Sequence, residues 1–420
     1  MNNRNDYDYF DLDNFDDSYD SRDYRRRSNR GNGSYNRRPV KRRNTRRIRN
    51  RIIIISSLII ILAVIIFIVS LLFKGCTDSA QQALAAVSTE TVSKTSVSTD
   101  DSAQPDKSAS DLTFVTPQID DDNTNGEMVY NIYVWHNTGF ELFSNDESRA
   151  KKYAETINGF ANHFGSTVSV YDMIVPNHTE MGLPQRLKDS GAPSGSQADN
   201  IKSAYSALSN KVTPINCYNQ LAEHNKEYIY FKSDHHWTGL GAYYAYTAFA
   251  EAKNLPVLPL DDCTENKVEG FTGSFTNTAG GLDSDTVSYW ELPYSVTMDI
   301  TGSDGTSNTY DSPYYQYAEG GANTYGVFVM GDNPLTVMKS DSQNAQTGKK
   351  IAVIKESYGN AFVPYLTYNY DEVHVIDFRY YNGNLVTYCQ ENNIDEVLFL
   401  NGIMSANTQI QLDSMSSLFN

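Results

Sequence analysis

The chain has 420 residues, 40% of them hydrophobic, and a formal net charge of −17 at pH 7. Its length allows two or three average domains. Residues 1–51 carry 15 basic and 8 acidic side chains, a net charge of +7, so the remainder carries −24. A region this acidic is not expected to bind nucleic acid, and its overall field favours neutral or cationic substrates over polyanionic polymers.

Three segments precede the predicted globular part. Residues 1–51 consist of blocks of like charge with almost no aliphatic side chains, which predicts a disordered tail. Ile52–Phe73 has 22 residues and no charge, which is long enough for one transmembrane helix. It is too long and begins too late for a cleaved signal peptide. Residues 74–127 are rich in Ser, Thr, Ala, Asp and Gln and predict a flexible extracellular spacer.

The distribution of basic residues predicts how the chain is oriented. Thirteen Lys and Arg residues lie between Arg25 and Arg51, whereas Lys74 stands nearly alone beyond the apolar segment. The positive-inside rule therefore predicts a single-pass cell-membrane protein with a cytoplasmic N-terminus and an extracellular C-terminal domain. In that oxidising setting at most one disulfide is expected among Cys217, Cys263 and Cys389.

Residues 128–420 alternate between strand-like and helix-like segments. The predicted strands are Val129–Val134, Val168–Val175, Tyr228–Phe231, Ile351–Lys355, Val373–Phe378 and Glu396–Leu400. The predicted helices are Ser148–Phe164, Ala198–Leu208, a helix after Thr238, Phe362–Tyr370, Leu385–Glu391 and one from about Thr408. This alternation predicts an α/β fold, a mostly parallel sheet with helices on both faces. Residues 255–350, with short β-like pieces such as Tyr325–Met330, are expected to form a β-rich insertion.

The stretch Tyr228–Tyr246 concentrates chemically active side chains. Its apolar start leads into Ser233-Asp234-His235-His236-Trp237, and Thr238 is the expected N-cap of the next helix. Two imidazoles and a carboxylate in a loop cost stability unless they pair or take part in chemistry. In extended backbone, Asp234 and His236 project to the same side while His235 points away. The pair is a base beside an orienting carboxylate, two of the three members of a nucleophilic triad; a structural hydrogen-bonded pair is the alternative.

Ser357 is the candidate for the third member. It lies two residues beyond the strand Ile351–Lys355, and Gly359 and Asn360 start the next helix. A serine at a strand-to-helix turn is exposed at the sheet edge beside backbone N–H groups that can bind an oxyanion. His236 is the base that would activate its hydroxyl. A helix N-cap is the ordinary structural role of such a serine.

Further polar residues follow the predicted strands and should share one edge of the sheet. The Ser357 N–H is expected to bind an oxyanion, with a side-chain amide of Asn401 or Asn177 as a second donor. Arg379 is expected either to hold a carbonyl or sugar hydroxyl or to form an ion pair at the sheet end. Tyr380 either stacks on a sugar ring or closes the core, and His178 lines the same edge or lies in a solvated loop. The aromatic residues Tyr289, Trp290, Tyr294, Tyr310, Tyr314, Tyr315 and Tyr317 are suited either to glycan stacking or to a plain β-sheet.

Three sequence blocks resemble a known family. Ser233–Thr238 (SDHHWT), Lys355–Asn360 (KESYGN) and Asp377–Tyr381 (DFRYY) resemble the DHHW family of membrane-anchored bacterial surface proteins. That family is similar to the SGNH-hydrolase-like proteins that O-acetylate alginate and other exopolysaccharides. The resemblance covers residues 128–420 and implies an SGNH-hydrolase-like fold. It also implies Asp234 as acid, His236 as base, Ser357 as nucleophile, and a multi-pass membrane acyltransferase as partner.

His235 departs from the alginate proteins, which tend to have threonine at this position. The difference leaves open an exchange of roles between the histidines, a substrate contact by His235, or a metal. Adjacent residues rarely reach one tetrahedral ion together, and no other His or Cys spacing supports a site. We therefore expect no metal and no other cofactor.

Together these features predict a membrane-anchored extracellular serine acyltransferase that O-acetylates a cell-surface or secreted polysaccharide through an acyl-enzyme. A carbohydrate acetylesterase with the same triad is one alternative. A non-catalytic protein for glycan binding or assembly is the other.

The predicted orientation can be tested with a protease added to intact cells. We expect release of the acidic C-terminal domain by cleavage within residues 77–127, detected in the medium with an antibody against the C-terminus. Cleavage confined to the tail before Arg51 would contradict the orientation.

Overall fold

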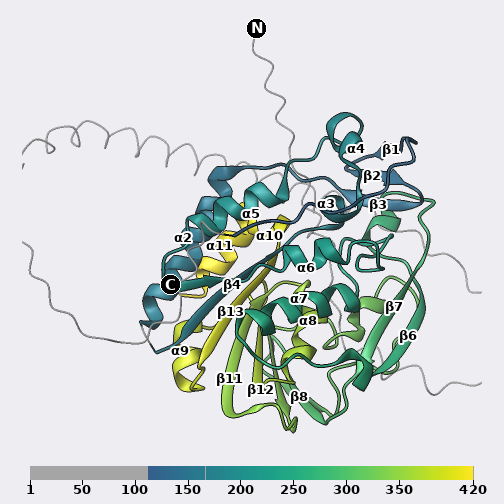
Figure 1. Cartoon of the computed structure of the whole chain (residues 1–420). Coiled ribbons are helices and arrows are strands. Elements are labelled where there is room, and N and C mark those ends of the chain that lie inside the picture. Colours follow the sequence, from purple (N-terminus) through teal and green to yellow (C-terminus); the bar gives the residue numbers. More distant parts are fainter. Residues whose placement is uncertain (1–111, 166, 420) are drawn as a thin grey trace, which may run out of the picture. The chain divides into compact units, whose positions relative to one another are not determined.

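The computed structural model describes residues 112–165 and 167–419 (Figure 1). The predicted tail, the apolar segment Ile52–Phe73 and most of the predicted spacer lie outside these residues. Within the part that is described, none of the helices has both the length and the apolar character needed to cross a membrane.

An eight-stranded sheet forms the centre of the fold, in the order β5-β4-β13-β11-β12-β10-β8-β9. The first five strands are parallel to one another, and the last three continue the sheet in antiparallel fashion. Their bounds are β4 Ser169–Val175, β5 Val212–Pro214, β8 Val296–Thr301, β9 Ser307–Tyr310, β10 Leu335–Ser340, β11 Gln346–Lys355, β12 Tyr370–Asp377 and β13 Glu396–Gly402. The sheet is therefore mixed, with a parallel half that carries buried apolar runs, as expected for strands covered on both faces.

Helices cover both faces of this sheet (Figure 1). One group comprises α2 Glu147–Phe164, α5 Gln197–Ser206, α9 Leu385–Glu391, α10 Ile403–Ala406 and α11 Gln409–Ser417. The other comprises α6 Tyr218–Glu223, α7 Gly239–Ala252 and α8 Gly359–Leu366, and the short α3 His178–Gly182 and α4 Gln185–Ser190 follow β4. Thr238 caps α7 as predicted, since its hydroxyl accepts a hydrogen bond from the Gly241 N–H.

Residues 255–350 form part of the main sheet and are not a separate insertion. They supply β8, β9 and β10 to the main sheet, and they also form a hairpin of β6 Thr264–Phe271 and β7 Asp285–Glu291. Short 3₁₀ turns, η4 Leu260–Asp262, η5 Ser274–Asn277 and η6 Thr324–Val327, connect these strands. The prediction of a β-like piece at Tyr325–Met330 is wrong. Val329 and Met330 have φ values of 46° and 58°, which a strand does not accommodate.

The predicted strand Tyr228–Phe231 is a loop. Its only ladder contact is an isolated bridge between Tyr230 and Trp237. The backbone N–H of Phe231 donates to the His236 carbonyl, and that of Thr238 donates to the Ile229 carbonyl. The segment satisfies its backbone by folding back on itself, so it does not need a neighbouring strand.

The last part of the predicted spacer is packed against the domain. The ring of Phe114 meets that of Tyr218 edge-on at 5.2 Å, and Arg186 forms an ion pair with Asp121 at 2.8 Å. A small sheet of β1 Glu127–Val129, β2 Ile132–Trp135 and β3 Thr138–Glu141 follows. Residues 112–127 are thus ordered by an aromatic contact and ion pairs that composition alone did not indicate. The three described cysteines are free thiols.

Asp172 is a fully buried carboxylate beneath α2. Its Oδ1 accepts a hydrogen bond of 2.5 Å from the Tyr153 hydroxyl, which in turn accepts one from Asn401. Its Oδ2 has no hydrogen-bond partner among the described residues. Burial raises the pKa of Asp172 to about 7.

This pKa predicts a pH-dependent loss of stability. An unfolded aspartate ionises near pH 4, whereas folded Asp172 stays protonated up to about pH 7. Between these values the unfolded state alone releases the proton, so Asp172 lowers the free energy of unfolding by about 4 kcal/mol as pH rises. In urea denaturation, the free energy of unfolding of Asp172→Asn relative to that of the wild type should therefore increase as the pH rises from 4 to 8. The exposed Asp413→Asn is the control, and an equal change in both variants would contradict the prediction.

Candidate active site

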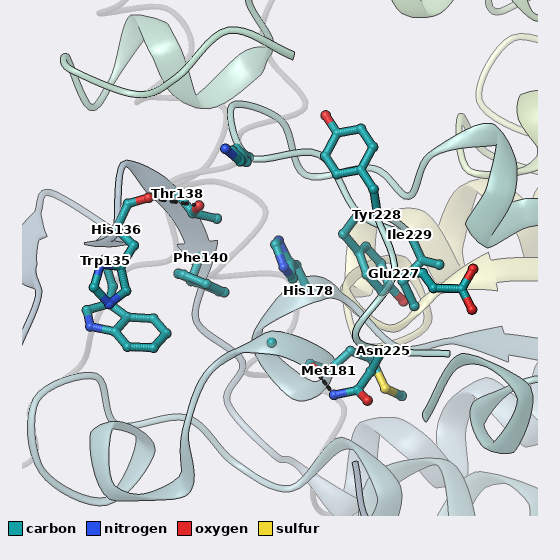
Figure 2. A pocket seen from close by; sticks show the side chains of 13 residues that line it. Trp135, His136, Thr138, Phe140, His178, Met181, Asn225, Glu227, Tyr228 and Ile229 are labelled. Carbon is teal, nitrogen blue, oxygen red and sulfur yellow. Dashed lines mark hydrogen bonds between the residues drawn. The ribbon is translucent and has the colours of Figure 1, made fainter. Parts of the chain in front are cut away.

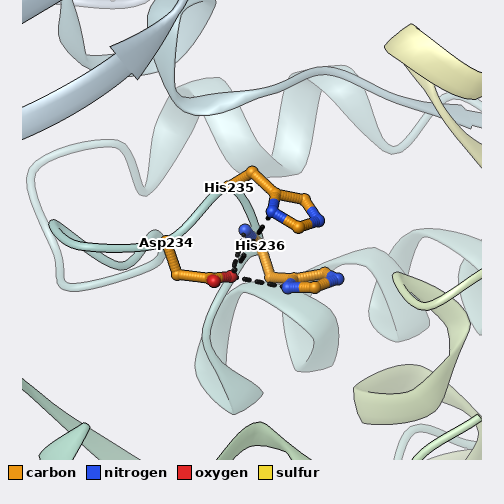
Figure 3. Close-up of side chains that lie close together, drawn as sticks. All are labelled: Asp234, His235 and His236. Carbon is orange, nitrogen blue, oxygen red and sulfur yellow. Dashed lines mark hydrogen bonds and ion pairs between the residues drawn. The ribbon is translucent and has the colours of Figure 1, made fainter. Parts of the chain in front are cut away.

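Asp234, His236 and Ser357 form a continuous hydrogen-bond chain. His236 Nδ1 lies 2.6 Å from Asp234 Oδ1, and His236 Nε2 lies 2.7 Å from Ser357 Oγ. A carboxylate only accepts, so Nδ1 carries the proton and Nε2 accepts from the serine hydroxyl. Figure 3 shows the Asp234 carboxylate directed at the His236 ring. The arrangement can withdraw a proton from Ser357 and stabilise the resulting imidazolium.

The turn between β11 and α8 presents Ser357. Helix α8 has Tyr358 at its N-cap position without a side-chain cap, so the Ser357 hydroxyl does not serve as an N-cap. The buried Glu356 carboxylate holds the turn, accepting from the Gly402 N–H at 2.7 Å and from the Tyr358 N–H at 3.0 Å. Its Oε2 also lies 3.2 Å from Ser357 Oγ. The Ser357 N–H has no hydrogen-bond partner among the described residues and is available to an oxyanion.

A second buried carboxylate holds the loop that carries Asp234 and His236. Asp285, at the start of β7, accepts from the backbone N–H groups of Lys232 and Ser233 and from the hydroxyls of Ser233 and Tyr228. Four donors from one loop converge on this carboxylate, so the β6–β7 hairpin fixes the loop's position.

Two bonds join the loop to the nucleophile turn. The Trp237 indole N–H donates to the Tyr358 carbonyl at 2.9 Å. The Tyr358 hydroxyl donates to the His235 carbonyl. Both bonds span more than one hundred residues, and together they set the distance between His236 and Ser357.

The backbone at Gly273 lies close to Asp234, and this brings a further hydrogen-bond donor to the Asp234 carboxylate. The Ser274 N–H donates to Asp234 Oδ2 at 2.8 Å, and the His236 N–H donates to Oδ1 at 2.9 Å. A Cβ atom at Gly273 would lie 2.2 Å from the Asp234 Cβ. Burial alone would raise the pKa of Asp234, but electrostatic interaction with His235 and His236 and these hydrogen bonds hold it well below its usual range.

The His236 ring is held by aromatic neighbours. The Tyr325 ring stacks on it with a centroid distance of 4.1 Å and an interplanar angle of 10°. The His235 ring lies 3.9 Å away at a tilt of 37°. Only 8% of the His236 side chain is exposed, so its rotamer is fixed by packing as well as by the Asp234 bond.

His235 occupies the accessible side of this cluster. Its side chain is 32% exposed, and its Nδ1 lies 2.8 Å from Ser274 Oγ. Ligand atoms of Asp234, His235 and His236 lie within 4.8 Å of one another, the one such group of three among the described residues. Asp234 and His236 are already joined to each other and to Ser357, so a metal here would compete with the hydrogen-bond chain.

The structure gives Asn177 and Asn401 other contacts than the predicted oxyanion bond. Asn177 caps α3, accepts from Gln197 and donates to the Glu141 carbonyl. Asn401 is fully buried and donates to the Tyr153 hydroxyl. Each of these side-chain amides therefore donates one hydrogen bond to a partner inside the fold.

Arg379 lies at the sheet end in an ion-pair cluster. It donates to both carboxylate oxygens of Asp377 and contacts Asp332 at 2.8 Å, and the buried Lys355 ammonium contacts the same two carboxylates. Of the two roles considered for Arg379, these contacts match the ion pair. The Tyr380 ring is 38% exposed beside the guanidinium, at 5.2 Å from its central carbon.

Glu356, Asp285, Gly273 and Tyr325 were not among the predicted site residues. No local pattern marks them, because each acts through a segment distant in sequence. Glu356 adjoins the serine, but its acceptor role depends on Gly402, which comes 46 residues later.

Comparison with known proteins identifies the family of this chain. The family model described as "DHHW protein" matches residues 85–376, well over half of the chain and including Asp234, His236 and Ser357. The chain belongs to the DHHW family. No curated protein matches it.

Solved structures support the fold. A DHHW family protein from Eubacterium siraeum is similar at 27% identity and a TM-score of 0.64, covering 71% of this chain and 99% of that one. PatB1 from Bacillus cereus is similar at 22% identity and a TM-score of 0.56, covering 67% and 98%. A second PatB1 structure, with a sulfonyl adduct, has 20% identity and a TM-score of 0.55, covering 67% and 96%. At such identities the PatB1 likeness concerns the fold alone.

Gly273 provides a test of how strictly the Asp234 position controls Ser357. Gly273→Ala should displace Asp234 and slow modification of Ser357 by phenylmethylsulfonyl fluoride about 100-fold, the scale expected for a 1 Å misplacement. Mass spectrometry of the modified peptide measures the rate.

Gly280→Ala is the matched control, since a Cβ there meets no atom within 4 Å. It should react like the wild type. Equal rates in the two variants would show that the approach of Gly273 does not position Asp234.

Proposed function

We propose that this DHHW family member is a membrane-anchored extracellular serine acyltransferase that O-acetylates a hydroxyl of a cell-surface or secreted polysaccharide. The hydrogen-bond chain Asp234–His236–Ser357 is the observation that carries this proposal. It offers a nucleophile, a base and an orienting carboxylate in bonding contact, the requirement for acyl transfer through a covalent intermediate.

In the first half-reaction Ser357 Oγ bonds to the acyl carbon while His236 Nε2 takes its proton. The carbonyl oxygen becomes an oxyanion beside the Ser357 N–H. When the intermediate collapses, the imidazolium returns the proton to the leaving group and the acyl group stays on Ser357. Asp234 keeps the imidazole in its tautomer and stabilises its charge.

In the second half-reaction a sugar hydroxyl attacks the acyl-enzyme. His236 now accepts the hydroxyl's proton and then delivers it to Ser357 Oγ, so that the enzyme is regenerated and the sugar is esterified. Water in place of the sugar gives an esterase with the same residues. Transfer and hydrolysis therefore differ in which hydroxyl reaches the acyl-enzyme.

The resemblance of this family to exopolysaccharide O-acetylating proteins supports acetyl as the group and a glycan as the acceptor. We propose the membrane anchor at Ile52–Phe73, with the N-terminus in the cytoplasm, and a multi-pass membrane acyltransferase as the partner that supplies the acyl group. An anchor would keep this domain beside such a partner.

The test is a burst assay of the full chain with p-nitrophenyl acetate. The wild type should release nitrophenol in a burst that matches enzyme concentration, and Ser357→Ala should abolish it. Asp234→Asn should slow the burst by a factor on the order of 10⁴, because the wrong imidazole tautomer then faces the serine.

Ser307→Ala, an exposed position on β9, is the control and should keep the full burst. If added oligosaccharide accelerates turnover and becomes acetylated, the enzyme is a transferase; turnover that ignores the oligosaccharide indicates an esterase. An undiminished burst in Ser357→Ala would refute the serine mechanism, and glycan binding without any burst would favour a non-catalytic binding protein.

A further inference from the structure

A pocket of about 270 Å³ lies beside the loop that carries Asp234 and His236 (Figure 2). The hairpin of β2 and β3 forms one wall, the segment 225–232 forms the other, and α3 contributes His178 and Met181. Figure 2 shows His178 between Phe140 on the hairpin side and Ile229 on the opposite side. The volume is close to the lower end of the range for ligand pockets, which suits one small ring.

Aromatic surfaces line much of the pocket. Trp135 and Phe140 belong to the hairpin wall, and Tyr228, 41% exposed, belongs to the opposite wall. The His178 ring stacks on Tyr230 at 5.2 Å and an interplanar angle of 12°. Such faces pack against the C–H surface of a sugar ring while leaving its hydroxyl groups free to hydrogen-bond.

His178 supplies a hydrogen-bond acceptor in this lining. Its Nδ1 lies 3.2 Å from the Phe231 carbonyl oxygen, and a carbonyl only accepts, so Nδ1 carries the proton. Burial lowers the pKa of His178 to about 4, so the ring is neutral at pH 7 and Nε2 is a bare acceptor. Nε2 has no hydrogen-bond partner among the described residues. A ligand hydroxyl would satisfy it.

The ionisable groups of the lining contact partners within the protein. Lys232 contacts Asp283 at 3.1 Å, Glu227 contacts His224 at 2.7 Å, and His136 contacts Asp122 at 3.1 Å. Lys232, the one lysine or arginine among the lining residues, is thus neutralised by Asp283, so the lining offers no unpaired cation to an anionic ligand. Asn225 donates its amide N–H groups to the Gln118 and Met181 carbonyls, and its side-chain carbonyl oxygen is a further acceptor in the lining.

The pocket and the candidate active site share one loop. Lys232 lines the pocket and lies two residues before Asp234, a separation of at most about 7.6 Å between their Cα atoms. A chain of several sugars with one ring in the pocket is long enough to span the separation between Lys232 and Asp234.

We propose that this pocket, with His178 Nε2 as acceptor and Trp135 and Tyr228 as aromatic faces, binds one ring of a neutral polysaccharide acceptor. The inference rests on the proposed glycan acyl transfer and assigns the acceptor a binding subsite. It selects uncharged, hydroxyl-rich glycans, because acceptor groups need ligand donors and the acidic domain repels polyanions.

Isothermal titration calorimetry of the full-length Ser357→Ala chain tests the subsite without turnover. The probes are three neutral tetrasaccharides, cellotetraose, chitotetraose and xylotetraose, with tetragalacturonate as the anionic comparison. At least one neutral probe should bind saturably and at least about tenfold more tightly than the anionic one.

Two additional substitutions locate the binding in the pocket. Trp135→Ala should weaken it about tenfold and Trp135→Phe much less, because a phenyl face remains. His178→Phe, with its thermal unfolding checked, should weaken it about five- to tenfold, the scale of one hydrogen bond. Tyr317 is an 80% exposed aromatic outside the pocket and belongs to the other group of residues suited to glycan stacking. Tyr317→Ala tests that rival site and should bind like the parent.

Absence of binding by all three neutral probes would overturn the subsite, as would a loss caused by Tyr317→Ala but not by Trp135→Ala. The nitrophenyl acetate burst of the wild-type chain is measured separately. A burst without glycan binding would support the serine chemistry and reject the glycan subsite. Glycan binding without a burst would support the subsite and reject the serine chemistry.

Discussion

The hydrogen bond from Ser357 to His236 joins segments that are 121 residues apart, and the geometry of the whole site depends on it. No strand pairing or shared helix brings these two residues together. The serine is carried by a turn at the end of a parallel strand, and the histidine by a loop that belongs to no sheet. Their distance is therefore set by the packing that holds the turn and the loop together, chiefly the paired bonds of Trp237 and Tyr358.

Buried carboxylates hold the turn and the loop in their individual conformations. Glu356 gathers N–H donors around the nucleophile turn, Asp285 gathers four donors from the preceding loop, and Asp234 is satisfied by three donors of its own. Removing a carboxylate from water is costly unless several hydrogen bonds replace its hydration. Each of these carboxylates has its full set of hydrogen bonds only when segments distant in sequence come together. The site therefore assembles at the same step in which the carboxylates gain their hydrogen-bond donors.

The β6–β7 region helps to hold the loop that carries Asp234 and His236. It brings Asp285 and the Gly273–Ser274 turn to the loop, while the strands that follow it extend the main sheet. The small sheet near residue 130 performs a comparable task on the other side, since it forms one wall of the pocket beside the same loop. Both regions support one short segment, Tyr228–Trp237.

Sequence alone determined the alternating α/β pattern, the candidate roles of Asp234, His236 and Ser357, and the family, because strand periodicity and a compact motif are local properties. Asp234 and His236 lie two residues apart, so their pairing could be anticipated without a fold. Only the tertiary structure decided that Tyr228–Phe231 is a loop, that Asn177 and Asn401 serve the interior, and that Arg379 joins an ion-pair cluster. These outcomes depend on partners such as Glu141, Tyr153 and Asp332, which are distant in sequence. The residues that flank a polar group do not indicate which distant partner it will bond in the folded chain.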